Sequence, residues 1–578
     1  MAAFTWRGPV AAHDVLNLGP LILIQPLLDQ LDVEAIIDRH LPADPQQEFS
    51  HGQVLRLLLM ARLAQPTALV NVADWAAKTG ADILSNIPAD KLNDDRLGRA
   101  LDAFFSHRHS ILGSVTAQAL QVTGLMQDRL HFDATHLILS GAYASSQPRL
   151  ARSPGQPLRG NDQMAPAHAC HGYATKDTKL IQAGQLAIVD DQGAVPVFVH
   201  CFDGNRNNHS AIHETLDLAG QHLDWPDSVL FISDRGTCSI EHIARLHRNG
   251  HQVLCAANWK DYRALYNAHA DRLEWQQATF LSIEQQRRRR TQSRLPHEQY
   301  EIAVLKHTLI DPTDRSKIPA RLIFVYSSAD ERECRQHRGD NIAKIRAGLE
   351  KLQAKVLRGH PQCTTLSITN QINRLMGKRE AARYFNWQLV PLTDAERAAL
   401  PTPRRGCCRA TQRLEFSYDA AAAEAGELYD GLSVLVTTAS TLHSGDALFS
   451  KYKQQNYVEL LHHQSKTPLA VAPIFLKSPQ RVEALVCLLQ LALQAYQVLE
   501  RLYRQRVPAD ALPAEQRMTS EQLLRIFQVY GLLVQQGVYG RVIHVTRLSN
   551  RQSQVLTRLQ FPTPAQIIDR LLMPVPSG

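Results

Sequence analysis

The sequence lacks the features that are typical of membrane-spanning proteins, exported proteins and metal-finger proteins. Its 578 residues contain no run of about 18 apolar residues, so no segment is predicted to span a membrane. The N-terminal stretch does not join a charged segment to an unbroken apolar core, which argues against export. The nine cysteines are odd in number and no pair has metal-finger spacing, so we expect reduced thiols in a cytoplasmic protein.

Net charge is also low, and nothing in the composition indicates extensive disorder. Sixty-three basic and 55 acidic residues leave +8, which permits an acidic polymer as a partner without identifying one. Apolar residues make up 44% and charged residues 20%, a balance that excludes a mainly disordered chain. The charge is unevenly distributed, because residues 266–430 hold 27 basic and 20 acidic residues, or +7 of the +8.

The N-terminal region, residues 1–125, is predicted to be helical. Apolar residues recur at helical spacing over Leu21–Leu41, Ser50 is a suitable N-cap for the next helix, and a third helical pattern begins at Asn93. A cluster of short helices of this kind either holds a helix-turn-helix reader of DNA ends or forms a plain accessory domain.

Beyond residue 125 the pattern changes to alternating strands and helices. The expected elements are strands at Leu130–Phe132, Gly184–Val189 and Val195–Phe202, a helix at His209–His222, a strand at Val229–Ser233, a helix at Ser239–Arg248 and a strand at Gln252–Ala257. The order β-β-β-α-β-α-β is that of a ribonuclease H-like core. We therefore predict an α/β fold.

The remaining chain is predicted to complete this core around an insertion. A strand at Gly431–Thr437 and helices at Leu448–Lys466 and Val482–Tyr503 follow the basic segment, and a further strand is expected at Arg541–Thr546. The predicted division is a helical N-terminal domain (1–125), the first part of the core (126–265), a basic, partly strand-rich insertion (266–430), the second part of the core (431–506) and a C-terminal tail region (507–578).

Two aspartates follow apolar strands of the predicted core. Asp133 and Asp234 each come directly after such a strand, at the edge where α/β sheets usually bind ligands. Carboxylates brought together there repel each other, and a divalent cation such as Mg²⁺ or Mn²⁺ relieves the repulsion. Two such ions suit the cleavage of a phosphodiester. The alternative is that each aspartate is only a turn residue or a helix cap.

The predicted helix at residues 448–466 carries a polar stripe. At about 100° per residue, Tyr452, Gln455, Glu459 and Lys466 lie within roughly 60° of one another, and His463 joins the same face. The stripe combines an acid, a base, an amide and a phenol. The alternative is an ordinary solvated helix face.

These spacings resemble a known signature. Tyr452-(2)-Gln455-(3)-Glu459-(6)-Lys466 resembles the Tyr-(2)-Arg-(3)-Glu-(6)-Lys signature of family-four insertion-sequence DDE transposases. The segments LHFDATH and VLFISDRGTCSIEHIARL look like the family's two aspartate-bearing blocks. The resemblance covers roughly residues 126–260 and 428–505, while the N-terminal region and the insertion match only in general style.

The resemblance implies a fold, a reaction and a set of partners. It implies a ribonuclease H-like core in which Asp133, Asp234 and Glu459 hold two Mg²⁺ ions, with Mn²⁺ as an alternative. It also implies cleavage of double-stranded DNA at the inverted-repeat ends of a mobile element, followed by strand transfer into target DNA. A homodimer in a synaptic complex, associated with the nucleoid, is expected by the same analogy.

DNA contacts are implied for the remaining signature residues. Tyr452 and Lys466 match the family residue by residue, whereas Gln455 stands where the family has an arginine, so a bidentate phosphate contact is lost. Basic residues of the insertion are further candidates for phosphate contacts, the alternative being a solvated charge run; these are Arg287, Arg288, Arg289, Arg290, Arg404, Arg405 and Arg409.

Other polar residues near these motifs are interpreted as structural. Turn chemistry explains Asp190, Asp191 and Asp203. His462 is interpreted as a surface histidine, the alternative being contact with the edge of the metal site. Two rival functions remain at this point. One is a structure-specific nuclease of the same fold that moves no element, and the other is a catalytically decayed DNA-binding protein, against which the presence of all three acids argues.

Overall fold

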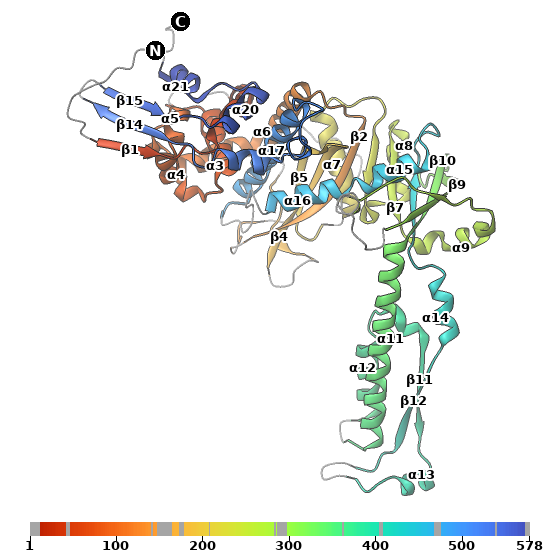
Figure 1. Ribbon diagram of the computed structural model, residues 1–578. Coiled ribbons are helices and arrows are strands. Elements are labelled where there is room, and N and C mark those ends of the chain that lie inside the picture. Colours follow the sequence, from red (N-terminus) through yellow and green to blue (C-terminus); the bar gives the residue numbers. More distant parts are fainter. Residues whose placement is uncertain are drawn as a thin grey trace.

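A computed structural model shows an elongated body from which a narrow stalk projects at one end (Figure 1). The structure describes residues 12–41, 47–139, 141, 143–146, 165–172, 178–206, 208–282, 285, 298–360, 363–403, 408–466, 476–537 and 540–572. The predicted α/β character is confirmed, because a large mixed sheet lies among helices from both ends of the chain.

The central sheet has ten strands in the order β3-β4-β2-β6-β7-β13-β10-β9-β8, with β5 also paired to β4. Its strands are β2 (Arg129–Ile138), β3 (Cys170–His171), β4 (Lys179–Asp190), β5 (Gly193–Asp203), β6 (Leu230–Ser233), β7 (Gln252–Ala257), β8 (Gln276–Gln277), β9 (Tyr300–Ile310), β10 (Lys317–Ser327) and β13 (Leu432–Thr437). The strands β2, β6 and β7 run parallel, and the other pairs are antiparallel. The strands predicted before residue 260 are confirmed, most of them longer than predicted.

Two long helices form the centre of the hydrophobic core. The helices α6 (Asp94–Thr123) and α17 (Pro479–Gln505) pack on each other and on β5. Arg108 of α6 donates from Nε to Glu483 of α17 at 2.9 Å, and both side chains are fully buried. Among the described helices, α17 alone has the length and apolar composition of a membrane span, and it is wholly buried inside the protein, as a core helix is.

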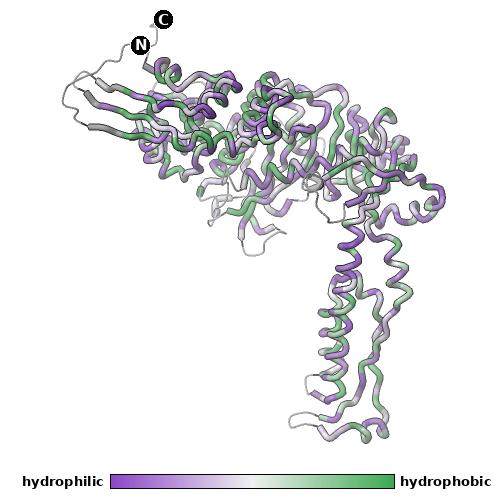
Figure 2. Tube along the Cα trace, viewed as in Figure 1, coloured by the Kyte–Doolittle hydropathy of each residue, from purple (hydrophilic) through white to green (hydrophobic). Residues whose placement is uncertain are grey.

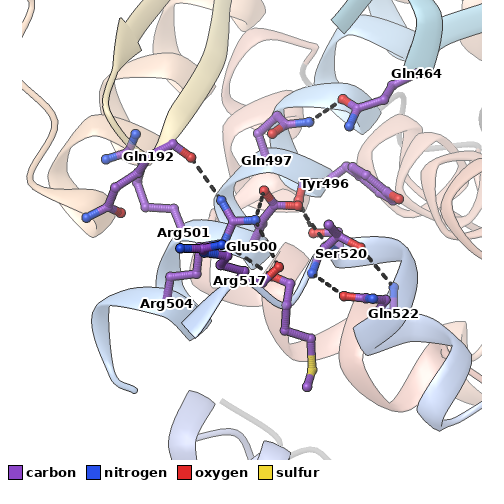
Figure 3. Close-up of polar contacts among 12 residues, drawn as sticks. Gln192, Gln464, Tyr496, Gln497, Glu500, Arg501, Arg504, Arg517, Ser520 and Gln522 are labelled. Carbon is purple, nitrogen blue, oxygen red and sulfur yellow. Dashed lines mark hydrogen bonds and ion pairs between the residues drawn. The ribbon is translucent and has the colours of Figure 1, made fainter. Parts of the chain in front are cut away.

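The C-terminal half of α17 joins separate parts of the body, as Figure 3 shows. Gln497 donates to Gln464 of helix α16 (Asn456–Lys466) at 2.5 Å, and Arg504 donates to the backbone carbonyl of Gln192 in the β4–β5 turn at 2.9 Å. Glu500 accepts from the backbone N–H of Ser520, in α19 (Ser520–Ile526), at 3.0 Å. These bonds fix α16 and the tail relative to the sheet.

The N-terminal helices are confirmed, with one departure. The predicted helix over residues 21–41 is two helices, because Asp32 adopts a left-handed conformation with φ 50° between them. The predicted cap Ser50 is present, since its side chain accepts from the backbone of Gln53. Asn93, where the third helical pattern was predicted to begin, caps α6 by accepting from the backbone of Arg96. The helices before α6 are α1 (Leu21–Gln30), α2 (Val33–His40), α3 (His51–Ala64), α4 (Val72–Thr79) and α5 (Ala81–Ser85).

A second, three-stranded sheet joins the N-terminal region to the C-terminal tail. Its order is β1-β14-β15, with β1 at Ala12–Leu16, β14 at Leu532–Gly537 and β15 at Gly540–Val545. The predicted strand near residue 541 is therefore confirmed, whereas β1 lies in a region predicted to be helical only. The other helices of the tail are α18 (Pro513–Gln516), α20 (Asn550–Leu559) and α21 (Pro564–Leu572).

Residues 266–430 divide between the sheet and the stalk. The strands β8, β9 and β10 extend the central sheet, while residues 328–427 form the stalk seen in Figure 1. The stalk contains α11 (Ser328–Leu357), α12 (Thr365–Met376), β11 (Phe385–Pro391), α13 (Asp394–Ala399), β12 (Gln412–Tyr418) and α14 (Ala420–Glu427). It has a hydrophobic core of its own, which includes Ile345, Leu349, Ile368, Tyr384 and Leu414.

Candidate active site

Asp133 and Asp234 lie side by side on neighbouring strands. In the parallel pair β2–β6, Phe132 is opposite Ser233, and the two aspartates are the next residues along each strand. Adjacent strands lie about 4.8 Å apart, so the two carboxyl groups share one edge of the sheet. The prediction that both aspartates end their strands is correct for Asp234 only, because β2 continues to Ile138 while β6 stops at Ser233.

The electrostatics of the pair reflect this proximity. Protein atoms packed around the carboxyl of Asp234 raise its pKa, and the negative charge of Asp133 raises that pKa further, although part of Asp234 is exposed. The two acids therefore repel each other, which is the condition that a divalent cation relieves.

The predicted helix over residues 448–466 is interrupted. The structure has α15 (Gly445–Lys453) and then α16, with Gln454 and Gln455 between them. Tyr452 consequently lies on a different helix from Glu459, and the prediction of one continuous polar stripe is wrong. Burial and the negative charge of Asp234 together raise the pKa of the Tyr452 phenol. Tyr452 therefore still lies near Asp234.

Gln455 occupies the interior rather than the surface. Its side-chain carbonyl lies 2.7 Å from Nδ1 of His131, and its amide donates to the backbone carbonyl of Phe132 at 3.2 Å. Only 7% of Gln455 is exposed. The predicted DNA contact by Gln455 is therefore wrong, since both ends of the amide bind the strand that carries Asp133. Burial also lowers the pKa of His131 to about 3, so its imidazole is neutral.

Glu459 lies between two residues that contact β2. Gln455 stands four residues before it, and His462 stands three residues after it, with Nε2 3.2 Å from Oδ2 of Asp133. Residues three and four apart share one helix face. Glu459 is exposed in the first turn of α16, on the helix that the His462 contact brings to β2.

The interpretation of His462 as a surface residue is wrong. Its side chain is 12% exposed and contacts Asp133, whereas the neighbouring His463, predicted to share the polar face, is exposed. The spacing of three residues from Glu459 was the available signal in the sequence. The alternative interpretation, in which His462 touches the edge of the acidic site, agrees with the contact to Asp133.

Of the other residues named in the sequence analysis, some have structural roles and several lie outside the described residues. Asp190 pairs with Arg501 at 2.5 Å and Asp203 accepts from the backbone of His168 at 2.8 Å, which confirms structural roles for both. Arg287, Arg288, Arg289 and Arg290, together with Arg404, Arg405 and the side chain of Lys466, lie outside the described residues. Arg409 is exposed on the stalk.

The three carboxylates suit a divalent metal ion in charge and in donor type. Carboxylate oxygens are the hard ligands that Mg²⁺ and Mn²⁺ prefer. A second group of potential ligands, His109, His200 and Glu483, is buried in the core, with ligand atoms within 4.8 Å of one another. There, however, Arg108 already neutralises Glu483, so a divalent cation would meet a guanidinium.

The fold is a mixed α/β fold in which Asp133 and Asp234 lie on neighbouring strands of the central sheet. The family model described as a transposase DDE domain matches residues 153–494, so the chain belongs to this family. The enzyme is therefore a DNA transposase that cleaves DNA and transfers strands, and transposases of this class use divalent metal ions. The match includes Asp234 and Glu459 and begins 20 residues after Asp133.

The remaining comparisons give one further domain match and one remote structural similarity. A domain of unknown function (DUF4277) matches residues 13–116, and no curated protein matches the sequence. A cryo-EM structure of a piggyBac transposase synaptic complex with hairpin DNA is 8% identical, with a TM-score of 0.35, over 98% of this chain and 89% of that chain. At this level the two chains are only remotely alike.

Proposed function

We propose that this transposase belongs to insertion-sequence family four and has a ribonuclease H-like catalytic core. The strand order β5-β4-β2-β6-β7, with three antiparallel strands followed by two parallel ones, supports that core. The spacing of Tyr452, Glu459 and Lys466 supports the family. The observation that carries the proposal is the placement of Asp133 and Asp234 on the neighbouring strands β2 and β6, with α16 held against β2 by the contact of His462 with Asp133.

The catalytic role is assigned to Asp133, Asp234 and Glu459, which would hold two Mg²⁺ or Mn²⁺ ions. Such ions, when bound, lower the pKa of an attacking water or hydroxyl and stabilise the charge on the leaving oxygen. The protein's own contribution is to hold its three carboxylates in place, because carboxylates displaced by an ångström lose much of their effect. Tyr452 and Lys466 are assigned to DNA beside the cleavage point.

The proposed reaction proceeds in two substitutions at phosphorus. Water first attacks a phosphodiester at the inverted-repeat end of the element, and the bond from phosphorus to the 3′ oxygen breaks to leave a 3′-hydroxyl. That hydroxyl then attacks a phosphodiester of the target DNA, so one bond forms as another breaks. No covalent bond to the protein is needed. The N-terminal region is assigned to recognition of the ends, and a homodimer to their pairing.

Gln455 is assigned a positioning role in place of the family's DNA contact. Gln455, four residues before Glu459, bonds to His131 and to the backbone carbonyl of Phe132, the two residues before Asp133. These bonds join segments that are more than 300 positions apart in the sequence. Partners of this kind, placed behind metal ligands, typically change metal affinity or activity by about 10- to 100-fold when removed.

The proposal is tested by cleavage of supercoiled DNA carrying the element's ends. The wild-type enzyme with Mg²⁺ is expected to release the ends and to join them to a second plasmid. Asp133→Asn, Asp234→Asn and Glu459→Gln should each abolish both steps while DNA binding persists. Cleavage at wild-type rate by all three variants would remove the assigned site, and cleavage without strand transfer would indicate a nuclease instead.

A further inference from the structure

A row of basic side chains follows the outer half of the stalk helix α11. We call it the basic ridge, and it consists of Lys344, Lys351, Lys355 and Arg358. Their spacings of seven, four and three residues place them within about 60° on the helix surface. The apolar face of the same helix points elsewhere, into the core of the stalk, through Ile345, Leu349, Leu352 and Val356.

The ridge is not neutralised by the stalk itself. Among the described residues, none of its four cations has a carboxylate within ion-pair distance, and three of the four are exposed, with Lys355 partly so. Some other stalk cations are paired, among them Arg383 with Glu380, Arg397 with Asp394 and Arg413 with Glu396. Figure 2 shows hydrophilic residues along much of this helix.

The charge of the whole protein is concentrated in this part of the stalk. Residues 341–418 hold 14 basic and five acidic residues, a net charge of +9, which leaves −1 for the rest of the chain. The complementary partner is a polyanion, and the substrate of this enzyme is one.

We propose that the basic ridge binds the phosphate backbone of duplex DNA at a distance from the cleavage site. At 1.5 Å per residue, Lys344 lies about 24 Å along α11 from the sheet and Arg358 about 45 Å. A duplex that follows the stalk needs at least about 13 base pairs beyond the sheet edge to reach Arg358. The stalk then orients flanking DNA without reading its sequence, since phosphate contacts position and base contacts specify. This inference rests on the DNA transposition function.

The test is the salt dependence of DNA binding by the full chain. The quadruple variant Lys344→Gln, Lys351→Gln, Lys355→Gln and Arg358→Gln is titrated, without divalent metal, against duplexes of about 40 and about 10 base pairs. For the longer duplex, the slope of log K against log salt should be less steep in the variant than in the wild-type protein. We expect its magnitude to be smaller by about 3 to 4, at about 0.9 per lost phosphate contact. The shorter duplex is about 34 Å long and extends from the sheet edge past Lys344 but not to Arg358, so its slope should change by a smaller amount.

A charge-preserving control separates charge from folding. Lys344→Arg, Lys351→Arg and Lys355→Arg together should keep the wild-type slope, and both variants should keep the wild-type melting temperature. An unchanged slope in the glutamine variant overturns the inference, as does a change in oligomeric state by light scattering with no change in slope. If the wild-type protein binds and cuts DNA and only the slope fails to change, the proposed function stands. Failure of the wild-type protein to cut any DNA removes the proposed function instead.

Discussion

The body and the stalk differ in how far apart in the sequence their contacting residues lie and in how much net charge they carry. The body brings together residues far apart in the chain, such as His131 and Gln455, and buries the bonds between them. The stalk, residues 328–427, is continuous in sequence and builds its small core from within that range. The body carries a net charge close to zero around its acidic centre, while residues 341–418 carry +9. Chemistry needs precise relative placement, whereas attraction of a polyanion needs only exposed charge on a stable support.

The largest expected effect sharpens the role of the body. Asp234→Asn removes one charge from the acidic centre and leaves the shape of the side chain unchanged. We expect DNA cleavage to fall by about three orders of magnitude, because several kcal/mol of charge stabilisation depend on this site. Gel assays of end cleavage measure the loss. Binding of a long duplex, which the comparison assigns partly to the stalk, should change little, and a parallel loss of binding would contradict that division.

Breaking the buried ion pair should destabilise the body and spare the stalk. Glu483→Ala leaves the guanidinium of Arg108 buried without a carboxylate, and we expect a loss of about 3–5 kcal/mol in the free energy of unfolding. Denaturant unfolding followed by circular dichroism measures it. The double variant Arg108→Met, Glu483→Leu should recover most of the loss, because apolar residues of similar volume fill the space without desolvating a charge.

A substitution in the core of the stalk should destabilise the stalk and leave the body intact. Leu349→Ala opens a cavity in the stalk core and should cost about 2–4 kcal/mol in stability there. We expect hydrogen exchange to accelerate in α11 and α12 while the sheet stays protected. Cleavage of a short duplex should remain at the wild-type rate. Equal acceleration of exchange in α6 and α17 would mean that the stalk and the body unfold as one unit.

The smallest of these effects concerns the adjacent glutamines. Gln455→Ala should weaken Mn²⁺-induced thermal stabilisation and cleavage by about 10- to 100-fold in apparent metal affinity, since it releases β2 from the segment before α16. The comparison variant is Gln454→Ala, which removes bonds to Arg129 at 3.0 Å and to Asp191 at 2.7 Å but leaves the two bonds of Gln455 in place.

An arginine at position 455 distinguishes positioning from DNA contact. Gln455→Arg restores the residue type of the family signature, and a DNA-contact role predicts tighter DNA binding. We expect impaired cleavage instead, because a guanidinium would be buried against His131 and the Phe132 carbonyl. Anisotropy titration of DNA and end-cleavage assays, run on the same preparation, separate the two outcomes.

Much of this protein was predictable because the governing interactions are local. Apolar segments indicated the strands before Asp133 and Asp234, and the N-cap Ser50 and the helical pattern from Asn93 marked where helices begin. The three acids were selected by their spacing and by the resemblance that this spacing carries. The concentration of positive charge between the two halves of the core is also a property of the sequence alone.

What only the tertiary structure decided depends on contacts between distant residues. No proline or glycine marks the interruption between α15 and α16, where Gln455 instead bonds to strand β2. The pairing of β1 with β14 and the contact of His462 with Asp133 join segments separated by hundreds of residues. Local propensity cannot determine such contacts, because their free energy exists only once the sheet has brought both partners together. The sequence therefore determined which carboxylates are candidates for the chemistry, and the fold decided which side chains contact them.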